Sequence, residues 1–101
     1  MKKYNKLVRD NIPDIIMAKG EECLFHIADK YEYNQKLIEK LVEESTEFAK
    51  DESIEEMADI FEVIDAICEY KGFEKDKIFE IQAQKRVRKG GFDGRIVLDE
   101  S

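Results

Sequence analysis

The chain has 101 residues and a formal net charge of −7, from 24 acidic and 17 basic side chains, with 43% hydrophobic residues, one Pro and no Trp. This length predicts a single domain over residues 1–101, and the composition excludes disordered, collagen-like and disulfide-framework proteins. The negative charge argues against general binding to a nucleic acid polymer or to an anionic membrane surface.

The charge is distributed unevenly along the chain. Residues 1–20 hold five bases and two acids (net +3), residues 85–101 hold five bases and three acids (net +2), and residues 21–84 hold seven bases and nineteen acids (net −12). No apolar run approaches the about 18 residues of a membrane span, and Cys23 and Cys68 lack metal-site spacing. We therefore expect a cytoplasmic protein with two reduced thiols and an acidic centre between basic ends.

The first predicted element is a short helix. Apolar residues around Pro13 predict it over residues 12–19, because Pro is tolerated in a first helical turn and Gly20 provides a stop signal. Residues 22–28 and 95–98 are apolar without helical spacing. They are candidates for one short pair of extended segments.

Two long amphipathic helices are predicted in the middle of the chain. A capping box that begins at Asp29 precedes a helical apolar pattern that continues to about residue 50. A second capping box, at Ser53, precedes another helical apolar pattern, which continues to about Tyr70 and ends before Gly72. Because only a few residues separate these helices, we expect an antiparallel hairpin. A further helix is predicted over about residues 74–89. The expected fold class is all-α, with the hairpin and flanking helices forming a dimeric helix bundle.

Four acids occupy matching positions on the two long helices. At about 100° per residue, Glu44 and Glu56 lie inside the apolar stripes, while Glu47 and Asp59 lie about 60° towards the polar side. A buried carboxylate without a partner is strongly unfavourable, so we expect something cationic to meet these acids. If the hairpin brings the two pairs together, all-oxygen ligation suits Mg²⁺, with Mn²⁺ as the other candidate.

Basic residues near the two ends of the chain are candidate phosphate ligands. Mg²⁺ bound by carboxylates commonly takes its remaining ligands from substrate phosphates, and phosphates also need Lys or Arg partners. The pattern as a whole points to metal-assisted attack of water on a polyphosphate. The candidates are Lys6, Arg9, Lys85, Arg86, Arg88 and Lys89.

These residues resemble the MazG-like superfamily of all-α nucleoside triphosphate pyrophosphohydrolases, and in particular its phosphoribosyl-ATP pyrophosphohydrolase-like branch. The superfamily motif E-E-x-x-E followed by E-x-x-D matches residues 43–47 and 56–59, and the segments 4–13 and 85–92 are also similar to that branch. Eight residues separate Glu47 from Glu56, fewer than in most of the superfamily. This shorter spacing affects the expected shape of the nucleotide pocket more than the expected metal site.

The resemblance implies hydrolysis of a nucleotide between its α and β phosphates, which yields a monophosphate and pyrophosphate. It also implies that relatives form dimers or tetramers, so we expect a homodimer at least. The shared motif does not determine the base or the sugar of the substrate. It also does not determine whether the substrate is a free nucleotide or a nucleotide conjugate. The implied Mg²⁺ ligands are Glu44, Glu47, Glu56 and Asp59, with Glu47 as a candidate to orient the attacking water and Asp65 as a candidate group beside the ligands.

The sequence also fits a different class of protein, namely a non-catalytic helical-bundle dimer that binds a nucleotide or a protein partner. Acid pairs three residues apart arise by chance in helices this acidic and then form a solvated face. An enzyme requires Glu44 and Glu56 to share one cavity, whereas the binding module allows them to face solvent or to pair with Lys or Arg. The acids expected to point outward are Glu43, Glu55 and Glu62, and His26 is expected to be structural.

Overall fold

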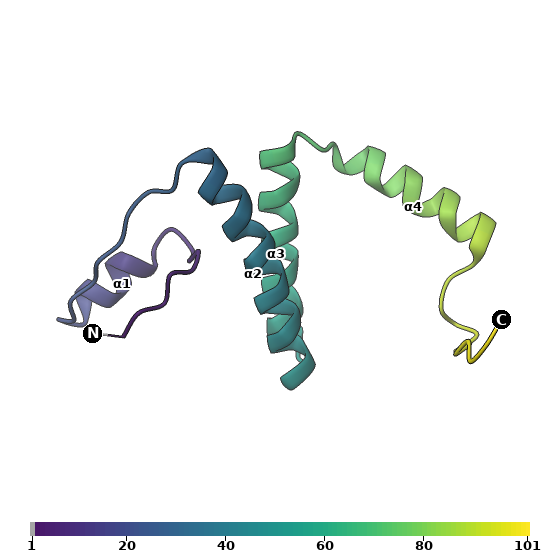
Figure 1. Ribbon diagram of the computed structural model, residues 1–101, viewed down its shortest axis with the longest axis horizontal. Coiled ribbons are helices and arrows are strands. Elements are labelled where there is room, and N and C mark those ends of the chain that lie inside the picture. Colours follow the sequence, from purple (N-terminus) through teal and green to yellow (C-terminus); the bar gives the residue numbers. More distant parts are fainter. Residues whose placement is uncertain (1) are drawn as a thin grey trace.

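The computed structural model describes residues 2–101, which form four helices and no strand (Figure 1). Helix α1 spans Ile12–Ala18, α2 spans Lys30–Lys50, α3 spans Ile54–Lys71 and α4 spans Lys75–Lys89. The all-helical class is therefore confirmed, and each helix begins and ends within about one residue of its predicted bounds.

The predicted pair of extended segments is wrong. Residues 22–28 and 95–98 are irregular, and no strand pairing joins them. The first segment connects α1 to α2 and the second follows α4, at opposite sides of the molecule (Figure 1). Two short segments without a third strand or a helix to cover them make a poor sheet, so local apolar composition did not suffice to pair them.

The two long helices begin at the side-chain caps that the sequence predicts. An Asp29 carboxylate oxygen accepts the backbone N–H of Glu32 at 2.9 Å, and the Ser53 hydroxyl oxygen accepts that of Glu56 at 3.2 Å. Helix α3 ends at Gly72, whose φ of 71° lies in the left-handed region that favours glycine. The Ser53 cap fixes the first turn of α3, and this turn carries Glu56.

Helices α2 and α3 lie side by side and are joined by a connection of three residues, 51–53 (Figure 1). The hydroxyl of Tyr70, near the end of α3, donates to the carbonyl of Lys30 at the start of α2, with a distance of 2.9 Å. The Tyr70 ring also meets the Tyr33 ring edge to face, with centroids 5.1 Å apart. This pair of helices supplies the small buried core of the described residues, which consists of Leu37, Val63 and Cys68.

Helix α4 extends away from the α2–α3 pair (Figure 1). The Cα radius of gyration is 17.9 Å, against about 13 Å for a compact domain of this length. Large apolar side chains of α4 are exposed, including Ile78, Phe79 and Ile81. No helix among residues 2–101 is both long and apolar enough to cross a membrane. Both cysteines, Cys23 and Cys68, are free thiols.

Candidate metal centre

Three carboxylates converge where the second half of α2 lies against the first turns of α3. Glu44, Glu56 and Asp59 each offer one oxygen, and these oxygens all lie within 4.8 Å of one another. Ligands on opposite sides of an octahedral Mg²⁺ are about 4.2 Å apart, given its short metal–oxygen bonds. The acid cluster, as we call these three residues, therefore has the ligand type and nearly the spacing that one hard cation needs.

Helix geometry explains why these side chains meet. Glu56 and Asp59 are three residues apart, so they project from one face of α3. Glu44 projects from α2 between the two helices, and its side chain is only 12% exposed. This burial agrees with the prediction that Glu44 lies inside an apolar stripe.

The charges in the acid cluster act most strongly on Glu56. Partial burial raises the pKa of Glu56, and the negative charges of Asp59, Glu44, Glu47 and Asp51 raise it further. Among the described residues, no basic side chain pairs with the Glu56 carboxylate. A divalent cation at this point would offset the repulsion among the acids.

Glu47 lies beside the acid cluster rather than within it. Its side chain is exposed, and its oxygens are not among those within 4.8 Å of one another. Its negative charge still contributes to the raised pKa of Glu56. The structure thus brings together three of the four predicted ligands and places the fourth at the edge of the cluster.

Two basic side chains already contact the acid cluster. The guanidinium of Arg9 lies 2.8 Å from Asp59 and 4.0 Å from Glu62, and the ammonium of Lys40 lies 3.2 Å from Glu44. Glu44 thus has a basic side chain as a partner, which is the pairing expected of the non-catalytic alternative, and the predicted metal ion stays a prediction. Sequence reasoning did not single out Lys40, although its position four residues before Glu44 on a helix is a recognisable pairing signal.

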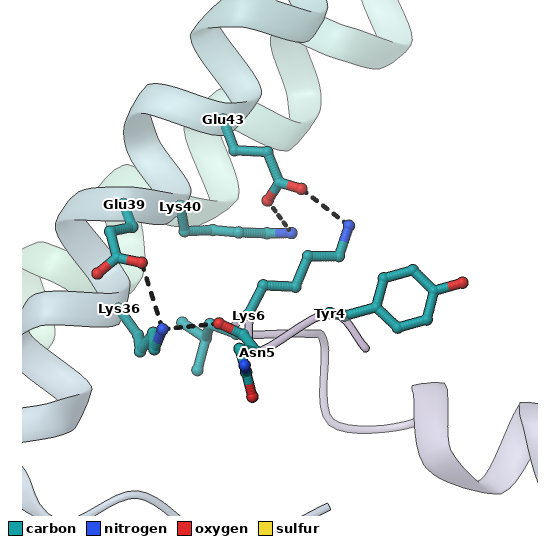
Figure 2. Close-up of a pocket in the computed structure, with 8 residues that line it drawn as sticks. Tyr4, Asn5, Lys6, Lys36, Glu39, Lys40 and Glu43 are labelled. Carbon is teal, nitrogen blue, oxygen red and sulfur yellow. Dashed lines mark hydrogen bonds and ion pairs between the residues drawn. The ribbon is translucent and has the colours of Figure 1, made fainter. Parts of the chain in front are cut away.

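Glu43 does not face solvent as an isolated surface acid, so that prediction is wrong. Its side chain is 29% exposed, and its two oxygens accept hydrogen bonds from the ammonium groups of Lys6 and Lys40, each at 2.8 Å (Figure 2). The plot of a single helix could not show this, because Lys6 arrives from an irregular segment 37 residues earlier in the chain.

The remaining predicted residues lie apart from the acid cluster. Asp65 pairs with Lys75 at 2.6 Å, near the junction of α3 and α4, and not with the candidate metal ligands. His26 is exposed and contacts Glu32 in the first turn of α2 at 2.8 Å. No ion pair among residues 2–101 links the basic end of α4 to the acid cluster. This end, which Figure 1 shows far from α2, carries Lys85, Arg86, Arg88 and Lys89.

No protein-family model, curated protein or solved structure matches this chain.

Proposed function

We propose that this protein is a Mg²⁺-dependent nucleotide pyrophosphohydrolase of the MazG-like all-α superfamily. It cleaves a nucleoside triphosphate or a related nucleotide between the α and β phosphates, and the products are a monophosphate and pyrophosphate. The observation that carries this proposal is the convergence of Glu44, Glu56 and Asp59, from two helices, within 4.8 Å. The motif resemblance supplies the reaction class.

The donor set of the acid cluster fits Mg²⁺, with Mn²⁺ as the alternative, because it is all oxygen and partly buried. When bound, the ion supplies an activated water and neutralises charge on the departing pyrophosphate. Glu44, Glu56 and Asp59 would hold the ion. Glu47, at the edge of the cluster, orients the attacking water by accepting a hydrogen bond from it. Arg9 lies 2.8 Å from Asp59, and its position beside the acid cluster supports the proposal that it contacts a substrate phosphate.

We further propose that α2 and α3 act as the antiparallel hairpin of a homodimeric bundle. The extended shape of one chain and the exposed apolar residues of α4 support this proposal, as does a shallow apolar hollow on the outer face of α2 around Leu41, Val42 and Ala49. A second copy would cover these surfaces. Sedimentation at micromolar concentration would then give at least twice the 11.9 kDa chain mass.

A second candidate function is a non-catalytic helical-bundle dimer that binds a nucleotide or a protein partner. The observation that favours it is that Lys40 and Arg9 already pair with Glu44 and Asp59, as expected of a charged face. Glu56 separates the two candidates, because its carboxylate has a raised pKa and no basic partner among the described residues. This unmatched charge favours the metal site.

The test is a panel of nucleoside triphosphates incubated with Mg²⁺, with release of pyrophosphate as the readout. Glu56→Gln removes the central carboxylate, and Glu55→Gln is the matched control, because Glu55 is an exposed acid in the same turn. We expect turnover by the wild type and by Glu55→Gln, and a loss of more than about tenfold in Glu56→Gln. No turnover of any nucleotide, or full activity of Glu56→Gln, would contradict the catalytic assignment.

A further inference from the structure

A pocket of about 260 Å³ lies between the N-terminal segment and α2 (Figure 2). Three lysines contribute to its lining, Lys6 from the N-terminal segment and Lys36 and Lys40 from α2, together with two acids, Glu39 and Glu43. Its ionised side chains thus carry a net charge of +1, in a chain whose net charge is −7. The pocket is a locally cationic site on an acidic protein.

Specific contacts hold the N-terminal wall of the pocket in place. Asn5 has a φ of 48°, in the left-handed region that Asn tolerates better than most residues. Its carbonyl accepts a hydrogen bond from the Lys36 ammonium at 2.6 Å, and Leu7 is half-buried. With the Lys6–Glu43 ion pair, these contacts fix both sides of the pocket.

The three ammonium groups keep unused hydrogen-bond donors. Lys6 contacts Glu43, Lys40 contacts Glu43 and Glu44, and Lys36 contacts the Asn5 carbonyl and Glu39. Each ammonium has three N–H donors, so about four of the nine remain available to a ligand. A ligand that accepts several hydrogen bonds from a small volume, as a phosphate group does, matches this arrangement.

Glu43 holds two of the ammonium groups of the pocket close together. Its two carboxylate oxygens lie 2.8 Å from the ammonium nitrogen of Lys6 and 2.8 Å from that of Lys40.

Lys40 also connects this pocket to the acid cluster. Its ammonium lies 2.8 Å from Glu43 in the pocket and 3.2 Å from Glu44 in the cluster. A polyphosphate with one phosphate at the cluster would therefore place the following phosphates against Lys40. The pocket volume is about nine times the share of one water molecule in the liquid, which leaves room for two linked phosphates and some water.

We infer that the pocket formed by residues 4–7 and by Lys36, Lys40 and Glu43 of α2 is the subsite for the pyrophosphate portion of the substrate. The assignment of this pocket to the substrate rests on the proposed function. The assignment of an anion-binding site rests only on the geometry of the three lysines. Lys36 and Lys40 bind the two terminal phosphates, and Lys6 contacts them from the N-terminal segment. The scissile α–β bond then lies beside the acid cluster.

The test is a titration of the full chain with inorganic pyrophosphate, in the presence of a metal chelator and at physiological ionic strength. Calorimetry measures the dissociation constant, and amide chemical shifts locate the site. Lys36→Gln and Lys40→Gln are the variants, and Lys77→Gln is the matched control. Lys77 is exposed on α4, and its one ion pair within the described part of the chain is with Glu80. The amide spectrum of each variant shows whether it is folded.

We expect Lys36→Gln and Lys40→Gln to weaken binding about tenfold or more, as loss of a charge-assisted hydrogen bond predicts, with Lys77→Gln unchanged. The shifts should centre on residues 4–7 and 36–43. Absence of binding, equal losses in all three variants, or shifts centred on residues 85–89 would overturn the inference. If pyrophosphate binds in this pocket but the protein hydrolyses no nucleotide, the anion site is supported and only the catalytic proposal is refuted. If the protein hydrolyses a nucleotide but pyrophosphate does not bind in this pocket, the catalytic proposal is supported and the subsite is refuted.

Discussion

The guanidinium of Arg9 lies 2.8 Å from the carboxylate of Asp59, although 50 residues separate them in the chain. A carboxylate that contributes to the acid cluster thus has a basic partner before any metal binds. Since both side chains are substantially exposed, this pair contributes at most about 1 kcal/mol to the stability of the folded chain. Its positive charge still opposes the binding of a cation to Asp59.

We predict that Arg9→Gln strengthens Mg²⁺ binding in the absence of nucleotide. The gain should be about two- to fivefold, which is the affinity change that corresponds to an exposed ion pair. The same variant should raise KM for the nucleotide, because Arg9 also contacts a phosphate in the proposed complex. Calorimetric titration with Mg²⁺ and steady-state kinetics measure the two effects. Weaker Mg²⁺ binding by Arg9→Gln would show that Arg9 does not compete with the ion.

Glu56 gives a prediction about stability. Because its pKa is raised in the folded chain, its ionised form is less favourable there than in the unfolded chain, whose pKa is near the ordinary value of 4.5. Above that pH the charge destabilises the fold. Glu56→Gln should therefore melt at a higher temperature than the wild type in a metal chelator. Mg²⁺ should raise the melting temperature of the wild type and leave that of Glu56→Gln unchanged.

Glu55→Gln controls for the loss of one acid from the first turn of α3. It should keep the stabilisation by Mg²⁺ that Glu56→Gln loses. Two results would contradict this account. A lower melting temperature for Glu56→Gln than for the wild type would show that the Glu56 charge does not destabilise the fold, and a gain in its stability on adding Mg²⁺ would show that the ion does not need Glu56.

The ion pairs of Glu43 predict that the free energy of unfolding decreases in acid. Burial raises the pKa of Glu43, but the hydrogen bonds and the charges of Lys40 and Lys6 favour the ionised form and lower the pKa overall, below the ordinary value of 4.5. The stabilisation is present above pH 4.5 and is lost as the pH falls through the lowered pKa of the folded chain. Glu43→Gln should thus reduce the free energy of unfolding by about 1 kcal/mol near pH 7, and this difference should shrink once the pH falls below the lowered pKa of Glu43. Urea unfolding at a series of pH values measures this difference, and a difference that grows in acid would refute it.

Ser53 links the fold to the acid cluster. Its hydroxyl accepts the backbone N–H of Glu56 at 3.2 Å, so Ser53→Ala should cost about 1 kcal/mol of stability and loosen the turn that carries Glu56. We expect a lower melting temperature together with weaker Mg²⁺ binding. Ser45→Ala is the matched control, because Ser45 lies inside α2 and, among residues 2–101, its hydroxyl donates only to the carbonyl of Leu41. If the two variants behave alike, the cap does not support the site.

Local signals were enough to predict the helices. The caps at Asp29 and Ser53 and the stop at Gly72 are encoded within a few residues, so their positions follow from the sequence. The spacing of Glu44 within an apolar stripe likewise predicts its burial. The three acids of the cluster could be named because helical periodicity and one short connection decide where they point.

Contacts between distant segments could not be predicted in the same way. The docking of Lys6 on Glu43 and of Arg9 on Asp59 depends on where an irregular N-terminal segment lies, and no periodicity describes such a segment. The failed pairing of residues 22–28 with 95–98 has the same cause. Position on a helix predicted an outward-facing Glu43, because a helical plot does not include the N-terminal segment whose Lys6 contacts this side chain.

The most direct test of the metal centre is paramagnetic broadening of amide signals by substoichiometric Mn²⁺ in the full chain. The convergence of Glu44, Glu56 and Asp59 predicts that signals of residues 43–47 and 55–60 broaden first, and that Glu56→Gln abolishes this selectivity while Glu55→Gln keeps it. Broadening that spreads evenly over the other exposed acids, or that is unchanged in Glu56→Gln, would contradict a metal site at this cluster.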